Sequence, residues 1–148
     1  MDEKDYEIPR EDLFGILYLI NKESPFFRFK TKLQKLILIA RIEFKYPFSF
    51  SFKPYYYGPY CEEINNVLGL LFLSRLIRTT VEELNDNSIY KYQLTEDGLN
   101  LLKSLSNKEE FKSLSRKIDD LWSKFAQKTI REIVDYAKRI SGIESITT

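Results

Sequence analysis

The segment Lys53-Pro-Tyr-Tyr-Tyr-Gly-Pro-Tyr60 places four tyrosine rings beside a lysine. Tyrosine rings stack on nucleic-acid bases and a lysine neutralises phosphates, so this spacing could bind nucleic acid. The same rings could instead hold a helix against a sheet, with the prolines fixing the turn. They could also contact a protein, since tyrosine is favoured at binding hot spots. The residues themselves leave these three interpretations open.

The tyrosines end a basic stretch of the chain. Residues 26–60 contain seven Lys or Arg side chains and one acidic side chain, whereas the whole chain has a net charge of +1. Lys32 and Lys35 share a helix face and could anchor phosphates, or they could simply form the solvated side of an amphipathic helix. The candidate DNA-binding residues are Arg28, Lys30, Lys32, Lys35, Lys53, Tyr55, Tyr56, Tyr57, Tyr60, Asn65, Asn66, Arg75 and Arg78.

Other residue types argue against an enzyme. The chain has no histidine, which removes histidine bases, triads and zinc ligands. A single cysteine, Cys61, excludes an intramolecular disulfide and multi-cysteine metal sites. We therefore predict no catalytic residue, no metal site and no cofactor. Cys61 could be a redox sensor if a helix N-terminus lowered its pKa, or it could be an inert, semi-buried thiol.

Hydrophobic periodicity predicts the elements that must position these residues. Apolar side chains at helical spacing indicate helices over about 10–21, 30–44 and 60–74. Phe48, Phe50 and Phe52 alternate with polar residues, which predicts a half-buried strand over 48–53. Strands over about 76–83 and 88–94 flank a polar turn and form a hairpin. Thr95 then caps a helix that runs to about 105, and Gly98 allows that helix to pack closely on the strand.

Residues 106–141 are predicted to be a helical extension. Its apolar residues are spaced three and four apart, as in a coiled-coil seam. We expect this stripe to pair with a second copy and form a homodimer, although it could instead pack on its own domain. The predicted dimerisation residues are Phe111, Leu114, Ile118, Leu121, Trp122 and Phe125. Thr129 and Glu132 could cap a second helix, so the extension is one kinked helix or two.

The order helix, hairpin, helix over residues 70–102 resembles a winged-helix domain. Three motifs further resemble the YwgA-like prokaryotic winged-helix proteins: a K-x-x-L-Q-K-L helix, an F-x-P-Y-x-Y-G-P-Y segment and an L-T-x-x-G wing end. The matching residues are Lys30, Leu33, Gln34, Lys35, Leu36, Phe52, Pro54, Tyr55, Tyr57, Gly58, Pro59, Tyr60, Leu94, Thr95 and Gly98. Cys61 departs from the serine usual in that family, so a side-chain cap is not expected there. The resemblance implies a fold more than an activity.

We therefore expect an α+β fold: a winged helix-turn-helix domain over 10–105 with a small antiparallel sheet, followed by the extension over 106–141. The preferred function is a transcriptional regulator that binds double-stranded DNA. Lys32, Lys35, Arg75 and Arg78 would anchor phosphates, with the Tyr55–Tyr60 loop and the third helix near the groove.

The alternative function is a protein–protein interaction module, antitoxin-like or adaptor, that does not bind DNA. Glu62 and Glu63 on the third helix favour it, because they would repel phosphates. The acidic N-terminus and the lack of a long apolar run predict a cytoplasmic protein that does not bind membranes. Abundant Ile, Lys, Glu and Tyr would suit a thermophile.

Overall fold

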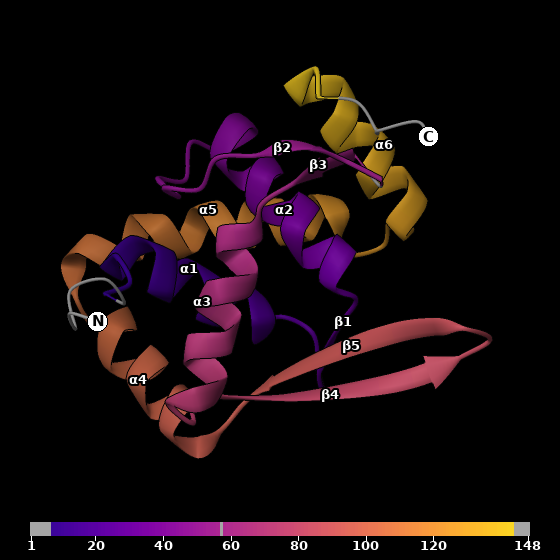
Figure 1. Cartoon of the computed structure of the whole chain (residues 1–148). Coiled ribbons are helices and arrows are strands. Elements are labelled where there is room, and N and C mark those ends of the chain that lie inside the picture. The colour runs from indigo at the N-terminus through magenta and orange to yellow at the C-terminus, as the bar shows by residue number, and fades with distance from the viewer. Residues whose placement is uncertain (1–6, 57, 144–148) are drawn as a thin grey trace.

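The computed structural model describes residues 7–56 and 58–143. These residues form an α+β fold with six helices and two small antiparallel sheets (Figure 1). The helices are α1 (Arg10–Ile20), α2 (Lys30–Glu43), α3 (Glu62–Leu73), α4 (Glu96–Ser106), α5 (Glu109–Phe125) and α6 (Ile130–Ser141). The strands are β1 (Phe27–Arg28), β2 (Lys53–Tyr55), β3 (Gly58–Tyr60), β4 (Ile77–Leu84) and β5 (Asn87–Leu94).

Helix α2 lies at the centre of the molecule. Every residue from Lys32 to Ala40 is buried, so the helix is covered on all sides. Its neighbours include α5, α6, β3 and β5. Because a helix buried all round cannot turn a polar face to water, each of its polar side chains must find a partner inside the protein.

Strands β4 and β5 form the predicted hairpin, which is confirmed. They pair from Ile77 with Leu94 to Leu84 with Asn87, and the ribbon extends away from the helices (Figure 1). Asn85 and Asp86 at its tip have positive φ angles of 49° and 67°, which asparagine and aspartate tolerate in tight hairpin turns. Strand β1 pairs with β5, giving the sheet order β1-β5-β4.

The strand predicted over 48–53 is wrong. Its alternation is real, because Phe48 and Phe50 are buried while Ser49 is exposed. However, Asp12 of α1 accepts hydrogen bonds from the backbone N–H and hydroxyl of Ser49, so a side chain takes the place of a neighbouring strand. The first strand is instead β1, which precedes α2 and was not predicted.

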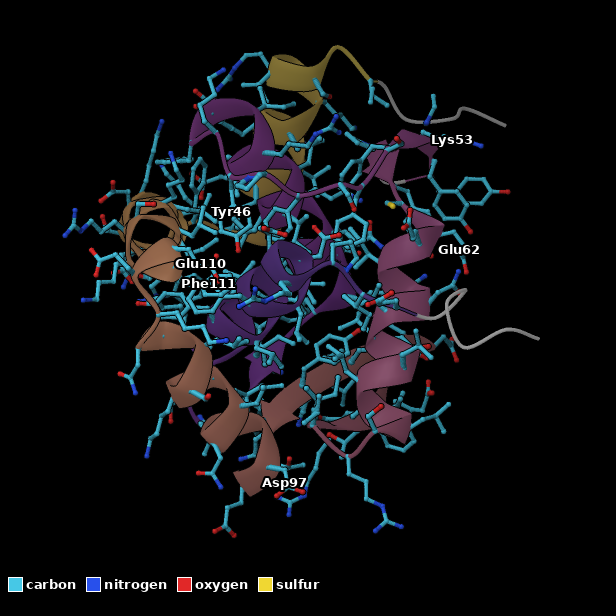
Figure 2. The ribbon with its side chains drawn as sticks, turned by 90° about the vertical axis from the view of Figure 1, so that its left-hand side faces the viewer. Tyr46, Lys53, Glu62, Asp97, Glu110 and Phe111 are labelled. Atoms are coloured by element: carbon cyan, nitrogen blue, oxygen red, sulfur yellow. The ribbon has the colours of Figure 1, made fainter. Side chains whose placement is uncertain are left out.

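The predicted extension consists of two helices, and Thr129 and Glu132 form the capping box between them. Both helices join the same core as α1 and α2. The Phe111 ring stacks on Phe14 with centroids 4.7 Å apart, and Figure 2 shows Phe111 inside the body of the molecule. The chain therefore packs this stripe against itself.

This packing corrects the predicted dimer seam. Phe111, Ile118, Leu121 and Phe125 are at most 1% exposed within one chain, and Leu114 and Trp122 pack partly buried against the same core. These side chains cannot form an intermolecular seam in this conformation. Homodimer formation through other residues stays a prediction. None of the described helices has the length and apolar character needed to cross a lipid bilayer.

Two glycine substitutions test the close packing at the end of the wing. A Cβ on Gly98 would lie 2.1 Å from the Leu76 carbonyl oxygen, so we expect Gly98→Ala to lower the free energy of unfolding by about 1–3 kcal/mol. Gly69 on α3 has nothing within 4 Å of its Cβ position, so Gly69→Ala should raise it by about 0.5–1 kcal/mol. Urea denaturation measures both; effects of the same sign would contradict this packing.

Candidate binding pocket

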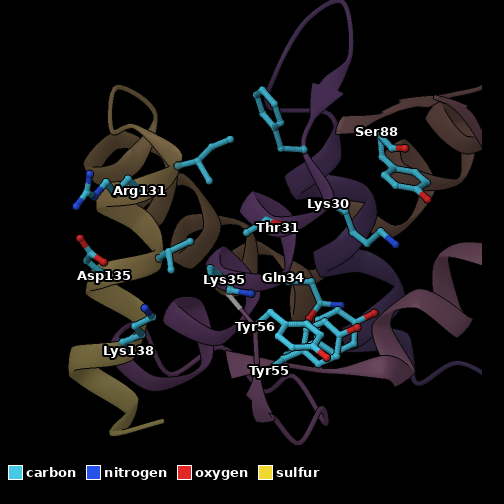
Figure 3. A pocket seen from close by; sticks show the side chains of 15 residues that line it. Lys30, Thr31, Gln34, Lys35, Tyr55, Tyr56, Ser88, Arg131, Asp135 and Lys138 are labelled. Carbon is cyan, nitrogen blue, oxygen red and sulfur yellow. The ribbon is translucent and has the colours of Figure 1, made fainter. Parts of the chain in front are cut away.

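A cavity of about 660 Å³ lies between α2, the β2–β3 hairpin, β5 and α6 (Figure 3). Its walls combine cationic and aromatic side chains from segments far apart in the sequence. The lining residues are Phe29, Lys30, Thr31, Gln34, Lys35, Tyr55, Tyr56, Tyr60, Ser88, Tyr90, Ile130, Arg131, Val134, Asp135 and Lys138.

Lys35 is the most unusual of these residues, because it is 2% exposed and yet carries an ammonium group. Figure 3 shows it at the centre of the cavity, between α6 and the tyrosines. Burial, and secondarily the Lys138 ammonium, lowers the pKa of Lys35 from 10.5 to about 8. Among the described residues, none forms an ion pair with Lys35. A buried cation without a counter-charge costs folding free energy, so its position in a cavity points to binding.

Lys32, one turn earlier on α2, shows how the fold treats a lysine that serves the structure. It is also buried, but its ammonium lies 3.3 Å from the Glu23 carboxylate. The same ammonium lies over the rings of Trp122 and Phe27, at 4.9 and 5.3 Å from their centroids. Such cation–π contacts stabilise a desolvated charge. Lys32 is therefore not the exposed phosphate anchor that the sequence predicted.

Three further cations line the cavity: Lys30 of α2 and Arg131 and Lys138 of α6. Asp135 is the one carboxylate in the lining. Within residues 7–56 and 58–143, no carboxylate lies within 4.0 Å of any of the three cations. Since four cations face one carboxylate, the cavity carries a net positive charge that favours anions.

The tyrosines give the cavity flat, apolar walls. Tyr55 stacks on Tyr60 with centroids 4.5 Å apart, and Tyr56 lies tilted beside them at 4.9 Å from Tyr55. Tyr55 and Tyr56 remain 41% and 55% exposed, so both offer ring surface to a ligand. On the other side, Lys30 lies 4.3 Å from the centroid of the Tyr90 ring.

Gln34 fixes the hairpin that carries these tyrosines. Its side-chain amide donates to the Cys61 carbonyl at 2.7 Å and accepts from the Cys61 N–H at 2.9 Å. This pair of hydrogen bonds joins the centre of α2 to the residue between β3 and α3. Gly58 has a φ of +90°, and a Cβ there would lie 3.1 Å from the Lys138 side chain, so the hairpin also packs closely on α6.

The cavity brings together five of the predicted DNA-binding residues. Lys30, Lys35, Tyr55, Tyr56 and Tyr60 all line it. The predicted tyrosine segment therefore lies beside the hairpin of β4 and β5, whose Ser88 and Tyr90 line the same cavity.

The other predicted residues lie elsewhere. Lys53 is exposed at the start of β2, on the same side of the molecule as Glu62 (Figure 2). Arg75 and Arg78 are exposed beyond the far end of α3, about 18 Å from its start for a helix of 12 residues. Two more contribute mainly to structure: Asn65 donates to the Tyr60 hydroxyl, and Arg28 is partly buried on β1. Asn66 is exposed on α3, and Tyr57 lies outside the described residues.

The sequence interpretation missed the contribution of α6. Arg131, Asp135 and Lys138 are spaced four and three apart, which places them on one helix face. That spacing is a signal visible in the sequence. The apolar stripe of residues 106–141 is the stronger pattern, and it predicts a dimer seam rather than a ligand site.

Cys61 does not have the lowered pKa that a reactive thiol needs. It is 3% exposed, and burial raises its pKa even though backbone N–H groups of Glu63 and Ile64 act in the opposite direction. The redox-sensor interpretation therefore loses its physical basis. In the described part of the chain, no three Cys, Asp or Glu side chains gather closely enough to hold a metal ion.

Comparison with known proteins gives no family assignment: no protein-family model and no curated protein matches this chain. The resemblance to YwgA-like proteins therefore stays a prediction. The function proposed below is inferred from the residues that line the cavity.

Lys35→Met tests whether the cavity holds an uncompensated charge. Methionine keeps most of the side-chain volume and removes the charge. We therefore expect the free energy of unfolding at pH 7 to be about 1–2 kcal/mol higher for the variant than for the wild type. The unfolded chain keeps this lysine protonated up to about pH 10.5, while the folded chain releases the proton near pH 8. As the pH rises above 8, the free energy of unfolding of the wild type should therefore increase relative to that of the variant.

Urea denaturation of both proteins at pH 7 and pH 9.5 measures this gap. The expected result is a gap that shrinks at the higher pH. A variant that is less stable than the wild type by the same amount at both pH values would show that Lys35 is already satisfied inside the fold.

Proposed function

We propose that this chain is a winged-helix transcriptional regulator that binds double-stranded DNA through the face around the cavity rather than through α3. The observation that supports the proposal is a group of cations beside exposed tyrosine rings, for which the described residues supply no carboxylate within 4.0 Å. Lysine and arginine side chains that lack protein counter-charges can neutralise phosphates and release counterions.

The order of elements supports a winged helix. A winged-helix domain places two helices between its first strand and its wing. With β1 as the first strand, α2 and α3 lie in that interval with the β2–β3 hairpin between them, and β4 and β5 form the wing. The wing end also fits, since Leu94 is buried, Thr95 accepts a hydrogen bond from the Gly98 N–H, and Gly98 lies against the Leu76 carbonyl.

Helix α3 is poorly suited to reading a DNA groove. Its first turn exposes Glu62 and Glu63, which repel phosphates, and its last turn exposes Phe72 and Leu73. Base edges are normally read by Arg, Lys, Asn, Gln or Ser side chains. Of these, the exposed face of α3 offers Asn66. Phosphate contacts from Lys30, Arg131 and Lys138, supplemented by Lys53, are therefore the better match to the charges that this chain presents.

A gel-shift titration with two matched double variants tests this proposal. Four phosphate contacts predict that the logarithm of the binding constant falls with a slope of about −3.6 against the logarithm of the salt concentration. Arg131→Gln/Lys138→Gln should weaken binding at least tenfold and reduce the slope by about 2. Arg75→Gln/Arg78→Gln removes the same number of charges from the far end of α3 and should change binding less than twofold.

The reverse pattern would place the duplex at the far end of α3, beside Arg75 and Arg78. Absence of binding at low salt would remove DNA as the partner.

The second candidate function is a protein–protein interaction module, and the exposed end of α3 favours it. Phe72 and Leu73 are 50% and 76% exposed, and Phe72 lines a cavity of about 310 Å³ together with Leu68 and Tyr92. Glu62 and Glu63 lie at the other end of the same helix. This combination fits an amphipathic partner segment with an apolar stripe and basic flanks. It is the function that a negative gel-shift result would favour.

A further inference from the structure

We infer that the cavity between α2, α6, β5 and the hairpin is a binding site for a nucleoside monophosphate, that is, a phosphate group joined to a planar aromatic base. This inference rests on the geometry of the cavity alone. It does not require that the protein bind double-stranded DNA.

The buried ammonium of Lys35 indicates an anionic group in the ligand. This side chain is 98% shielded from solvent, it faces the cavity, and none of the described residues supplies it with a counter-charge. An anionic group in the cavity would supply that charge, in the way that Glu23 does for Lys32. Lys138 and Arg131 of α6, which also line the cavity, could bind the remaining phosphate oxygens. A phosphate suits such a cluster because it presents several strong acceptor oxygens.

The aromatic wall of the cavity indicates a planar ring in the ligand. Tyr55 and Tyr56 keep exposed ring surface at the cavity, and a base that stacks on an aromatic side chain binds about fivefold more tightly or better. A bare phosphate ion would leave these rings uncovered. A cation cluster and a stacking surface in one cavity therefore match a ligand with both a phosphate and a ring.

The size and polarity of the cavity also match such a ligand. A volume of about 660 Å³ lies within the range of about 300–1,000 Å³ that is typical of small-molecule sites. The Gln34 amide is occupied by Cys61, and the Ser88 hydroxyl donates to the Glu83 carboxylate. The lining also offers the Thr31, Tyr55 and Tyr56 hydroxyls and the Asp135 carboxylate as hydrogen-bonding groups. Asp135 repels a phosphate but can accept hydrogen bonds from ribose hydroxyls or an exocyclic amine. The phosphate is therefore expected between Lys35 and Lys138, with the base on the tyrosine side of the cavity and Asp135 facing the solvent-side hydroxyls of the ligand.

The same chemistry could come from a free nucleotide or from the phosphorylated end of a single strand. A base-paired duplex keeps its bases stacked inside and cannot place one in the cavity without unpairing it. The experiment must therefore separate a free nucleotide from a strand end.

Isothermal titration calorimetry of the full chain at pH 7 tests the inference. The probes are the four ribonucleoside monophosphates, adenosine, inorganic phosphate and a single-stranded oligonucleotide with a 5′-phosphate. At least one monophosphate should bind at least tenfold more tightly than either adenosine or phosphate. An oligonucleotide that binds tenfold more tightly than every monophosphate identifies a strand end; equal or weaker binding identifies a free nucleotide.

Variants assign the binding to the cavity. Lys35→Met should weaken monophosphate binding at least tenfold, and Tyr56→Ala should weaken it about fivefold or more. Lys103→Met, which removes an exposed charge on α4 outside the cavity lining, should leave the affinity unchanged. Circular dichroism confirms that each variant is folded.

The pH dependence gives a readout that a purely structural role of Lys35 would not produce. The charged or titratable groups that face Lys35 are Arg131, Asp135 and Lys138 from α6, Lys30 from its own helix, and the tyrosines of the hairpin and β5. Affinity should fall between pH 7 and pH 9 in the wild type and stay flat in Lys35→Met, because the pKa of Lys35 is about 8.

Two results would overturn the inference. One is the absence of binding by every monophosphate and by the oligonucleotide at millimolar concentration. The other is binding that Lys35→Met leaves unchanged. Neither result bears on the gel-shift test, in which Lys35 is not altered, so the failure of this inference can be told apart from the failure of the DNA proposal.

Discussion

The burial of α2 from Lys32 to Ala40 is the constraint on which the rest of the structure depends. This helix carries three buried polar side chains, and the fold treats each one differently. Lys32 pairs with Glu23 and stacks on aromatic rings, while Gln34 exchanges two hydrogen bonds with the Cys61 backbone. Lys35 faces the cavity, and no carboxylate of the described residues lies within 4.0 Å of its ammonium. One helix therefore stabilises the body, positions the hairpin and supplies the charge of the candidate site.

The pairing of Gln34 with Cys61 links structure to site. Because both the N–H and the C=O of Cys61 are bound, the end of β3 and the start of α3 are held at a fixed place against α2. The tyrosines of the hairpin consequently face α2, and α6 closes the other side through the contact between Lys138 and Gly58. The cavity exists because three segments distant in sequence, the β2–β3 hairpin, β5 and α6, pack around α2.

Features controlled by neighbouring residues could be predicted from the sequence. The apolar spacing gave α1, α2 and α3 nearly to their ends, and the alternation around Asn85 and Asp86 gave the β4–β5 hairpin. The caps at Thr95 and Thr129 followed from local side-chain chemistry, and both are confirmed.

Features decided by long-range packing could not be predicted in the same way. Strand β1 has two residues, and its pairing with β5 defines it. Segment 48–53 has a strand pattern, but Asp12 replaces its partner strand. The stripe on α5 has coiled-coil spacing because it lies against α1 and α2 of its own chain, and spacing alone does not show which surface covers a stripe. Since Lys32 and Lys35 share a helix face and differ in their partners, the pattern of charges could not separate a structural lysine from a binding one.

Lys35 is a desolvated cation whose counter-charge is supplied by an anionic ligand. The most direct measurement is a side-chain NMR titration of Lys35, assigned by comparison with the Lys35→Met variant, in the absence and in the presence of a nucleoside monophosphate. The account predicts a pKa of about 8 for the free protein and a clearly higher pKa with the ligand, because an adjacent anion stabilises the charged form. A pKa near the ordinary lysine value that does not respond to the ligand would contradict it.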